Sequence, residues 1–302
     1  MVLKWVGAGI LALTTALAAA GCGDGTASDD GAPVIATTTI WADIASEVAC
    51  GAVIPSLIPP GADPHTFEPS LRDRETLDRS STVIANGLGL EAAVQPLLDT
   101  TDATVIEMTD LVDVIVDDGH DDDHDGNDGH DHEGGDPHIW QDPRRVIRTL
   151  DAIAAALHAA DLDTCVDDYR AELTTLDGEI EALLADLPSD ARVLVTSHDS
   201  LEYFAERYDF EIVGTVIPST STLAETNAAD LATLADAIEA QNVPAIFTDA
   251  FESTSDADAL ARRLDVRVVP LLTGALTDDP ATDTYVGMMR HNATLIAEAL
   301  TP

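Results

Sequence analysis

The chain alternates twice between short β-branched segments and segments whose apolar residues recur with helical spacing, first within residues 34–143 and again within residues 191–302. A strand followed by a helix and another strand gives a parallel sheet covered by helices, so each stretch predicts an α/β lobe. Residues 144–190 lie between them and are helical in pattern, and Cys165–Leu187 is long enough to connect the lobes. The predicted fold class is therefore α/β, with two parallel-sheet lobes joined by one long helix.

The segments expected to form strands are short and apolar, and most are rich in Val, Ile or Thr. They are residues 33–39, 53–58, 81–85 and 103–108 in the first lobe, and residues 192–196, 211–216, 245–248 and 266–272 in the second. The expected helices are residues 40–49, 70–78, 88–99, 145–160, 165–187, 201–208, 228–241, 255–264 and 284–300. Ligands bind beyond the carboxyl ends of parallel strands, so a site is expected in the loops that follow them.

Residues 1–22 have the composition of a secretion signal, because Lys4 precedes an apolar run and small residues precede Cys22. The run is too short and wrongly flanked for a membrane span. Its end, Ala-Ala-Gly-Cys, is similar to a bacterial lipobox, although Ala19 stands where Leu is usual, and we expect Cys22 to carry a lipid. The alternative is an ordinary secreted protein. Residues 23–33 have the composition of a flexible tether.

The formal net charge of −42 argues against a nucleic-acid partner, because a polyanion would repel the phosphate backbone. It fits an extracytoplasmic protein that attracts cations, or one adapted to salt, and charge alone does not separate these two. Cys50 and Cys165 are the other cysteines of the chain. In an oxidising compartment a disulfide between them is the economical interpretation, and two buried thiols are the alternative.

Residues 117–135 form a run of Asp, Gly and His with almost no apolar side chains, which predicts a loop. Four of the nine histidines lie in this run: His120, His124, His130 and His132. Imidazole and carboxylate together suit divalent transition metals, so we interpret the run as an accessory metal trap. The alternative is a solvated acidic loop.

Three further histidines fall in the loops where a site is expected. His65 follows residues 53–58, His138 lies between the first lobe and the helical segment, and His198 directly follows residues 192–196. Three imidazoles suit zinc, with a carboxylate or water in a fourth position. The alternatives are a surface position for His65 and a helix-start position for His198. His158 and His291 lie in helical patterns and are interpreted as packed or surface residues.

Five motifs together resemble the cluster A-I solute-binding proteins of metal ABC transporters, the ZnuA-like or TroA-like family. They are PPGADPHTFEPS, ANGLGLE, DPHIWQDP, TSHDSLEYFAERY and TYVGMMRHNATLI, in this order along the mature chain. The resemblance implies two α/β lobes joined by a single long helix, with a metal between the lobes and delivery of that metal to an ABC permease. It also implies His65, His138 and His198 as the matching ligands.

The resemblance includes one departure. Many members have an Asp ligand after the last strand, where this chain has Gly274. The fourth position therefore stays open between Asp249 at a strand end, Asp278 or Asp279 in the following loop, and water. Asp249 is ranked first because strand ends are better positioned than loop acids. Manganese-type members usually have Glu where this chain has His198, so zinc is favoured and manganese is the alternative.

These patterns predict a non-enzymatic, lipid-anchored, extracytoplasmic solute-binding protein that acts as a monomer and passes zinc to an ABC transporter permease. A zinc-dependent hydrolase is the first alternative, because three histidines and an open position also describe catalytic zinc. The sequence contains no HExxH or GxSxG motif and no nucleophile with an evident partner. A metal-dependent surface adhesin or storage protein is the second alternative.

Overall fold

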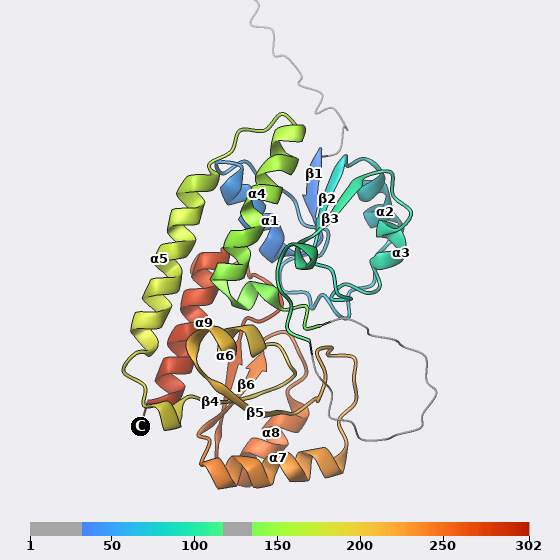
Figure 1. Ribbon diagram of the computed structural model, residues 1–302. Coiled ribbons are helices and arrows are strands. Elements are labelled where there is room, and N and C mark those ends of the chain that lie inside the picture. The colour runs from blue at the N-terminus through green and yellow to red at the C-terminus, as the bar shows by residue number, and fades with distance from the viewer. Residues whose placement is uncertain (1–31, 117–134, 302) are drawn as a thin grey trace, which may run out of the picture. The chain divides into compact units, whose positions relative to one another are not determined.

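The computed structural model describes residues 32–116 and 135–301, and residues 31–302 form one compact unit (Figure 1). The signal and most of the tether, with Cys22, lie outside the described residues. So do the four histidines of the His/Asp run, His120, His124, His130 and His132. Those interpretations therefore stay predictions. Within the described ranges, no helix combines the length and the apolar character that crossing a membrane requires.

The N-terminal lobe is built on a parallel sheet of three strands in the order β1-β2-β3. Its strands are β1 (Val34–Ala36), β2 (Thr82–Ala85) and β3 (Thr104–Glu107). Its helices are α1 (Thr39–Val48), α2 (Leu71–Asp78), α3 (Gln95–Leu98) and the 3-10 helix η1 (Met108–Leu111). The hydroxyl of Ser70 caps α2 and the Asp73 carboxylate bonds back to the Ser70 backbone, which explains where this polar helix begins.

Two elements expected in this lobe are shorter in the structure than the sequence predicted. Residues 53–58 do not form a full strand and make only an isolated bridge between Ser56 and Ala36. The helix expected over residues 88–99 is reduced to α3. The backbone at Gly87, Leu88 and Gly89 has positive φ, and such left-handed geometry prevents a right-handed helix from starting there.

The C-terminal lobe is a parallel sheet of four strands in the order β5-β4-β6-β7. Its strands are β4 (Val193–Thr196), β5 (Glu211–Thr215), β6 (Ala245–Asp249) and β7 (Arg267–Leu271). Its helices are α6 (Glu202–Tyr208), α7 (Ala228–Gln241), α8 (Ser255–Leu264) and α9 (Tyr285–Leu300), with the 3-10 helix η3 (Ser189–Ala191) before β4. The predicted class, α/β with two parallel sheets, is confirmed.

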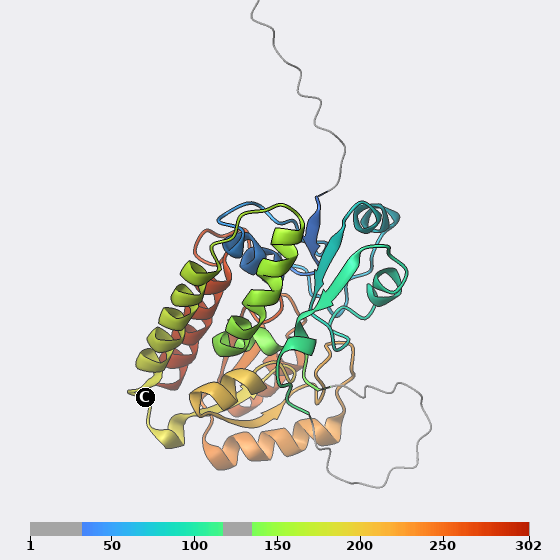
Figure 2. The same ribbon diagram turned by 45° about the horizontal axis from the view of Figure 1, so that its top comes forward.

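Two long helices lie between the two sheets in the chain, and the second of them connects the lobes. The 3-10 helix η2 (Ile139–Gln141) leads into α4 (Pro143–Ala159), which Asp142 caps, and α5 (Val166–Leu184) follows. The helix α5 packs against α4 and α9 and carries the chain from the N-terminal lobe to β4 (Figures 1 and 2). The predicted long connecting segment is therefore a real helix, and α9 lies beside it.

The main apolar core is shared by the two lobes. It includes four large aromatic side chains that are at most 1% exposed: Trp41 and Trp140 before α5, and Tyr203 and Tyr285 after it. Each lobe also has a smaller cluster of its own, around Ile35 in the first and around Val195 in the second. Truncating one such buried aromatic typically costs about 3–5 kcal/mol, so separating the lobes would be very unfavourable.

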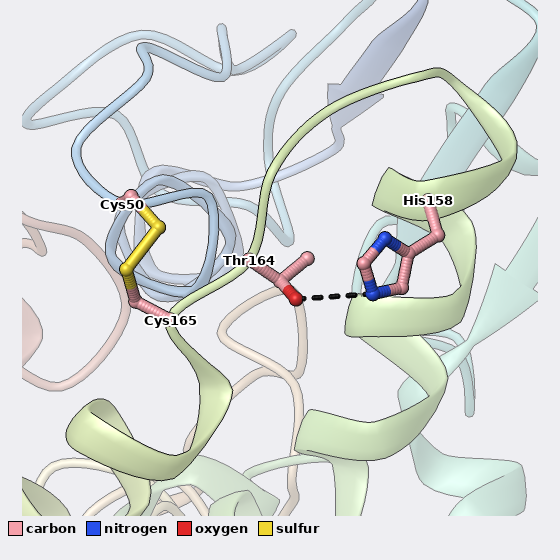
Figure 3. The surroundings of a disulfide bond; sticks show 4 residues. All are labelled: Cys50, His158, Thr164 and Cys165. Carbon is pink, nitrogen blue, oxygen red and sulfur yellow. Dashed lines mark hydrogen bonds between the residues drawn. A yellow bond between two sulfur atoms is a disulfide. The ribbon is translucent and has the colours of Figure 1, made fainter.

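A disulfide joins the end of α1 to the start of α5 (Figure 3). Cys50 and Cys165 have a Cα–Cα distance of 5.1 Å, and the Cys165 N–H donates to the Val48 carbonyl at 2.8 Å. In the same turn, Thr164 Oγ1 lies 3.1 Å from Nε2 of His158 (Figure 3). His158 is therefore an exposed helix residue with a local partner.

Replacing Cys50 and Cys165 by Ser should lower the free energy of unfolding by about 2–5 kcal/mol, because the bond closes a long loop in the unfolded chain. Their sequence separation is 115 residues. Urea unfolding of the metal-free protein measures the change. Reductant should lower the stability of the wild type by the same amount as the double substitution, and it should leave the serine variant unaffected. Identical urea unfolding curves of the wild type with and without reductant would contradict the prediction.

Candidate metal centre

His65, His138 and His198 come together between the two lobes, as the sequence predicted. Each contributes a ring nitrogen, and these three donor atoms lie within 4.8 Å of one another. Nε2 of His65 is 3.3 Å from Nε2 of His138, and the three ring centroids are 5.2–5.7 Å apart. The three residues are 6%, 1% and 2% exposed. Buried nitrogens that face one another at this spacing form a cation site rather than an apolar core.

The two Asp-Pro-His sequences fold in the same way. The Asp63 carboxylate accepts a hydrogen bond from the His65 N–H, and the Asp136 carboxylate accepts one from the His138 N–H, each at 2.9 Å. An Asp that bonds to the backbone two residues later forms an Asx turn, which fixes the direction of the following side chain. This explains why the motif occurs at two of the three histidines.

The two Asp residues differ in their second contact. Oδ1 of Asp136 also lies 2.6 Å from Nδ1 of His138. Oδ2 of Asp63 instead accepts a hydrogen bond from the hydroxyl of Thr222, which belongs to the opposite lobe. The first contact orients an imidazole, whereas the second ties the His65 loop to the C-terminal lobe.

The backbone around His138 is held from both lobes. The Asn86 side chain donates to the Pro137 carbonyl at 3.0 Å, and the Trp140 indole donates to the Thr273 carbonyl at 2.9 Å. The Tyr285 hydroxyl donates to the Trp140 carbonyl at 2.7 Å. Buried hydrogen bonds of this kind leave the segment little freedom, so His138 is positioned by a rigid support.

His198 directly follows β4 and Ser197, and its ring is oriented by an acid that the sequence analysis did not identify. Nδ1 lies 3.0 Å from Oε1 of Glu252, and the Ser197 hydroxyl is 3.4 Å from the same nitrogen. Nε2 is buried and has no hydrogen-bond partner in the part of the chain that the structure describes. Glu252 gave no sequence signal, because it is one of 56 acidic residues and lies in a loop.

Electrostatics keep two of the imidazoles neutral. Burial, followed by the repulsion from His138 and His198, lowers the pKa of His65 to about 3. Burial and the proximity of His198 hold the pKa of His138 well below its usual value. For His198, burial lowers the pKa, but the hydrogen bond and charge of Glu252 outweigh it and raise the pKa overall. The neutral rings keep free lone pairs, the form in which imidazole binds a metal.

Asp249, which the sequence analysis ranked first as a fourth ligand, is hydrogen-bonded within its own lobe. Its carboxylate oxygens do not belong to the group of donor atoms that lie within 4.8 Å of one another. Its Oδ2 accepts the N–H groups of Thr273 and Gly274 at 3.0 and 3.1 Å and also the Thr273 hydroxyl. Its Oδ1 accepts the N–H of Phe251 at 2.6 Å. Both oxygens therefore fasten β6 to neighbouring backbone.

Gly274 itself has a steric explanation. A Cβ atom at this position would lie 3.2 Å from Cδ of Pro64, the residue before His65. Any larger side chain would press on the His65 loop. Asp278 and Asp279, the other acids considered, are exposed and also lie outside the group.

Two parallel-sheet lobes with a buried imidazole triad between them define a metal-binding, solute-binding protein. The family described as "ZnuA: Zinc-uptake complex component A periplasmic" matches residues 34–299, and the chain belongs to this family of non-enzymatic solute-binding proteins of ABC importers. The recognition made from the five motifs is thus confirmed.

The relatives include proteins named as zinc-binding and proteins named as manganese-binding. The zinc-binding protein TroA of Treponema pallidum is 29% identical, with 91% of each chain covered. The manganese-binding lipoprotein MntA of Halalkalibacterium halodurans is 26% identical, with 95% of this chain and 96% of MntA covered. The solved structure of the periplasmic zinc-binding protein TroA matches with a TM-score of 0.75 and 26% identity, over 90% of this chain and all of that one. The comparisons show a metal-binding protein and leave the metal open.

Replacing His65 by Gln should make the stability of the metal-free protein less sensitive to acid. The folded pKa of about 3 lies below the ordinary value of 6.5, so the unfolded state binds the additional proton between these values. Stability contributed by His65 is present above pH 6.5 and is lost as pH falls, at a slope of at most about 1.4 kcal/mol per pH unit. Urea unfolding from pH 7 to pH 4.5 measures the slope, with His291→Gln as control. Equal slopes for all three proteins would contradict this.

Proposed function

We propose that this protein captures Zn²⁺ outside the cytoplasm and delivers it to the permease of an ABC importer. The observation that carries this proposal is the donor set, which consists of three buried imidazole nitrogens with no carboxylate among them in the described residues. Nitrogen donors favour zinc, whereas manganese prefers more oxygen ligands. The donor set therefore supports zinc, although relatives of similar identity bind either metal by name.

The ligand roles follow from the geometry. His65, His138 and His198 would bind the ion through one nitrogen each, and Nε2 is the nitrogen of His198 that Glu252 leaves available. We place water in the fourth position, since the Asp249 carboxylate is not among the donor atoms that lie within 4.8 Å of one another. Zinc with three histidines and water is a common arrangement.

The remaining parts of the chain fit delivery at a membrane. A lipid on Cys22 and a tether over residues 23–33 would keep the protein, as a monomer, near its permease. The His/Asp run would raise the local metal concentration and bind more weakly than the triad, because ordering such a segment costs conformational entropy. Several relatives carry the word lipoprotein in their names, which supports the anchor.

Replacing His65, His138 and His198 together by Ala should abolish tight zinc binding in the chain that begins at residue 23. The loss should be at least about 1,000-fold, because the three nitrogens make all the protein's contacts to the ion. Competition calorimetry with Zn²⁺ and Mn²⁺ measures it, and the wild type should prefer Zn²⁺. The matched control replaces His158 and His291, which lie outside the triad. Sub-micromolar zinc binding by the triple variant would refute the ligand assignment.

Deleting residues 119–133 should remove weak metal sites and leave one tight site. Metal titration followed by elemental analysis gives the number of ions bound per chain. A control that replaces the four histidines of the run by Asn keeps its length and most of its charge. If the deletion eliminates the tight site, the run is the main binding site and the triad is not.

A further inference from the structure

Glu252 contacts the metal centre from a turn between β6 and α8. Its side chain is only 8% exposed, and its Oε1 lies 3.0 Å from Nδ1 of His198. Nε2 of the same ring is buried and lacks a hydrogen-bond partner within the described ranges. The carboxylate therefore occupies one nitrogen of His198 and leaves the other for a ligand.

The position of Glu252 is that of a supporting residue and not of a ligand. Among the described residues, the group of mutually close donor atoms consists of nitrogens of His65, His138 and His198, and it includes no carboxylate oxygen. The Glu252 carboxylate therefore lies close to the ring of His198 but not close to all three donor nitrogens.

The turn that carries Glu252 is fixed on three sides. The Ala250 N–H donates to the Leu271 carbonyl at 2.8 Å, and the Phe251 N–H donates to the Asp249 carboxylate. The Phe251 ring lies 3.3 Å from the position that a Cβ atom of Gly61 would take, in the loop that leads to His65. Asp249 therefore serves the site indirectly, because it shapes the turn from which Glu252 reaches His198.

The same arrangement occurs at His138, where Asp136 contacts Nδ1 at 2.6 Å. Two of the three imidazoles are thus each supported by a buried carboxylate, one from each lobe. A carboxylate that accepts the Nδ1–H fixes the tautomer and makes Nε2 a stronger donor. A stronger nitrogen donor benefits zinc more than manganese.

We propose that Glu252 is a positioning residue that sets metal selectivity through His198, without binding the ion itself. Its carboxylate keeps the proton on Nδ1 and directs the lone pair of Nε2 toward the ion. This inference rests on the proposed function, since it assumes that the triad binds Zn²⁺. It assigns a role at the metal centre to a residue that is not one of the three ligands.

The test compares Glu252→Ala and Glu252→Gln with the wild type. Glu252→Ala should weaken Zn²⁺ binding by about 10–100-fold, the usual effect of removing such a supporting group, and should weaken Mn²⁺ binding less. Glu252→Gln should lose less Zn²⁺ affinity than Glu252→Ala, because its amide oxygen still accepts the Nδ1–H. Glu239→Gln, at an exposed position on α7, controls for the loss of one negative charge. Competition calorimetry measures all four proteins.

Long-range proton–nitrogen NMR of the zinc-loaded, histidine-labelled protein supplies a readout that a general loss of stability would not change. In the wild type and Glu252→Gln, His198 should carry the proton on Nδ1 and the metal on Nε2. Metal on Nδ1, or Zn²⁺ affinity in Glu252→Ala equal to wild type, would overturn the inference. If the wild type itself does not bind Zn²⁺ tightly, the proposed function fails. If the wild type and Glu252→Ala both bind Zn²⁺ equally tightly, only the role of Glu252 is refuted.

Discussion

Three imidazoles are buried against one another, and this crowding is the constraint on which the rest of the structure depends. Two of their nitrogens lie 3.3 Å apart, and the free nitrogen of His198 has no partner in the described part of the chain. Leaving polar nitrogens buried in this way is unfavourable in the absence of a cation. The surrounding protein must therefore prevent the rings from turning away or reaching water. Buried hydrogen bonds to their backbones and to the Nδ1 atoms of His138 and His198 provide that restraint.

The restraint comes from a scaffold in which neither lobe is independent. Asn86 supports the His138 segment from the N-terminal lobe, and Tyr203 donates to the Asp136 carbonyl at 2.6 Å from the other. The apolar core beneath them includes residues from both lobes and the connecting helices. A metal bound by His65, His138 and His198 would add bonds across a boundary that packing already holds closed.

The sequence predicted the fold and the triad because both leave strong local signals. Alternating strands and helices define parallel sheets, and histidines after their strands must then approach one another. The sequence did not predict what depends on distant contacts. Asp249 occupied the expected strand end, but its oxygens bond to Thr273, Gly274 and Phe251, and only the folded turn brings Glu252 to His198. The helix expected from residue 88 was wrong for a local reason, the left-handed backbone around Leu88.

The contacts that cross between the lobes near His65 are weaker than those in the core. Thr222 donates one hydrogen bond to Asp63, and the Gly61 N–H donates one to the Leu276 carbonyl. A hydrogen bond of this kind contributes about 1 kcal/mol, whereas each fully buried core aromatic contributes several. Local displacement of the His65 loop is therefore far less costly than separation of the lobes. Because His138 and His198 are each fastened by a buried carboxylate, the loop of His65 is the part of the triad whose displacement costs the least.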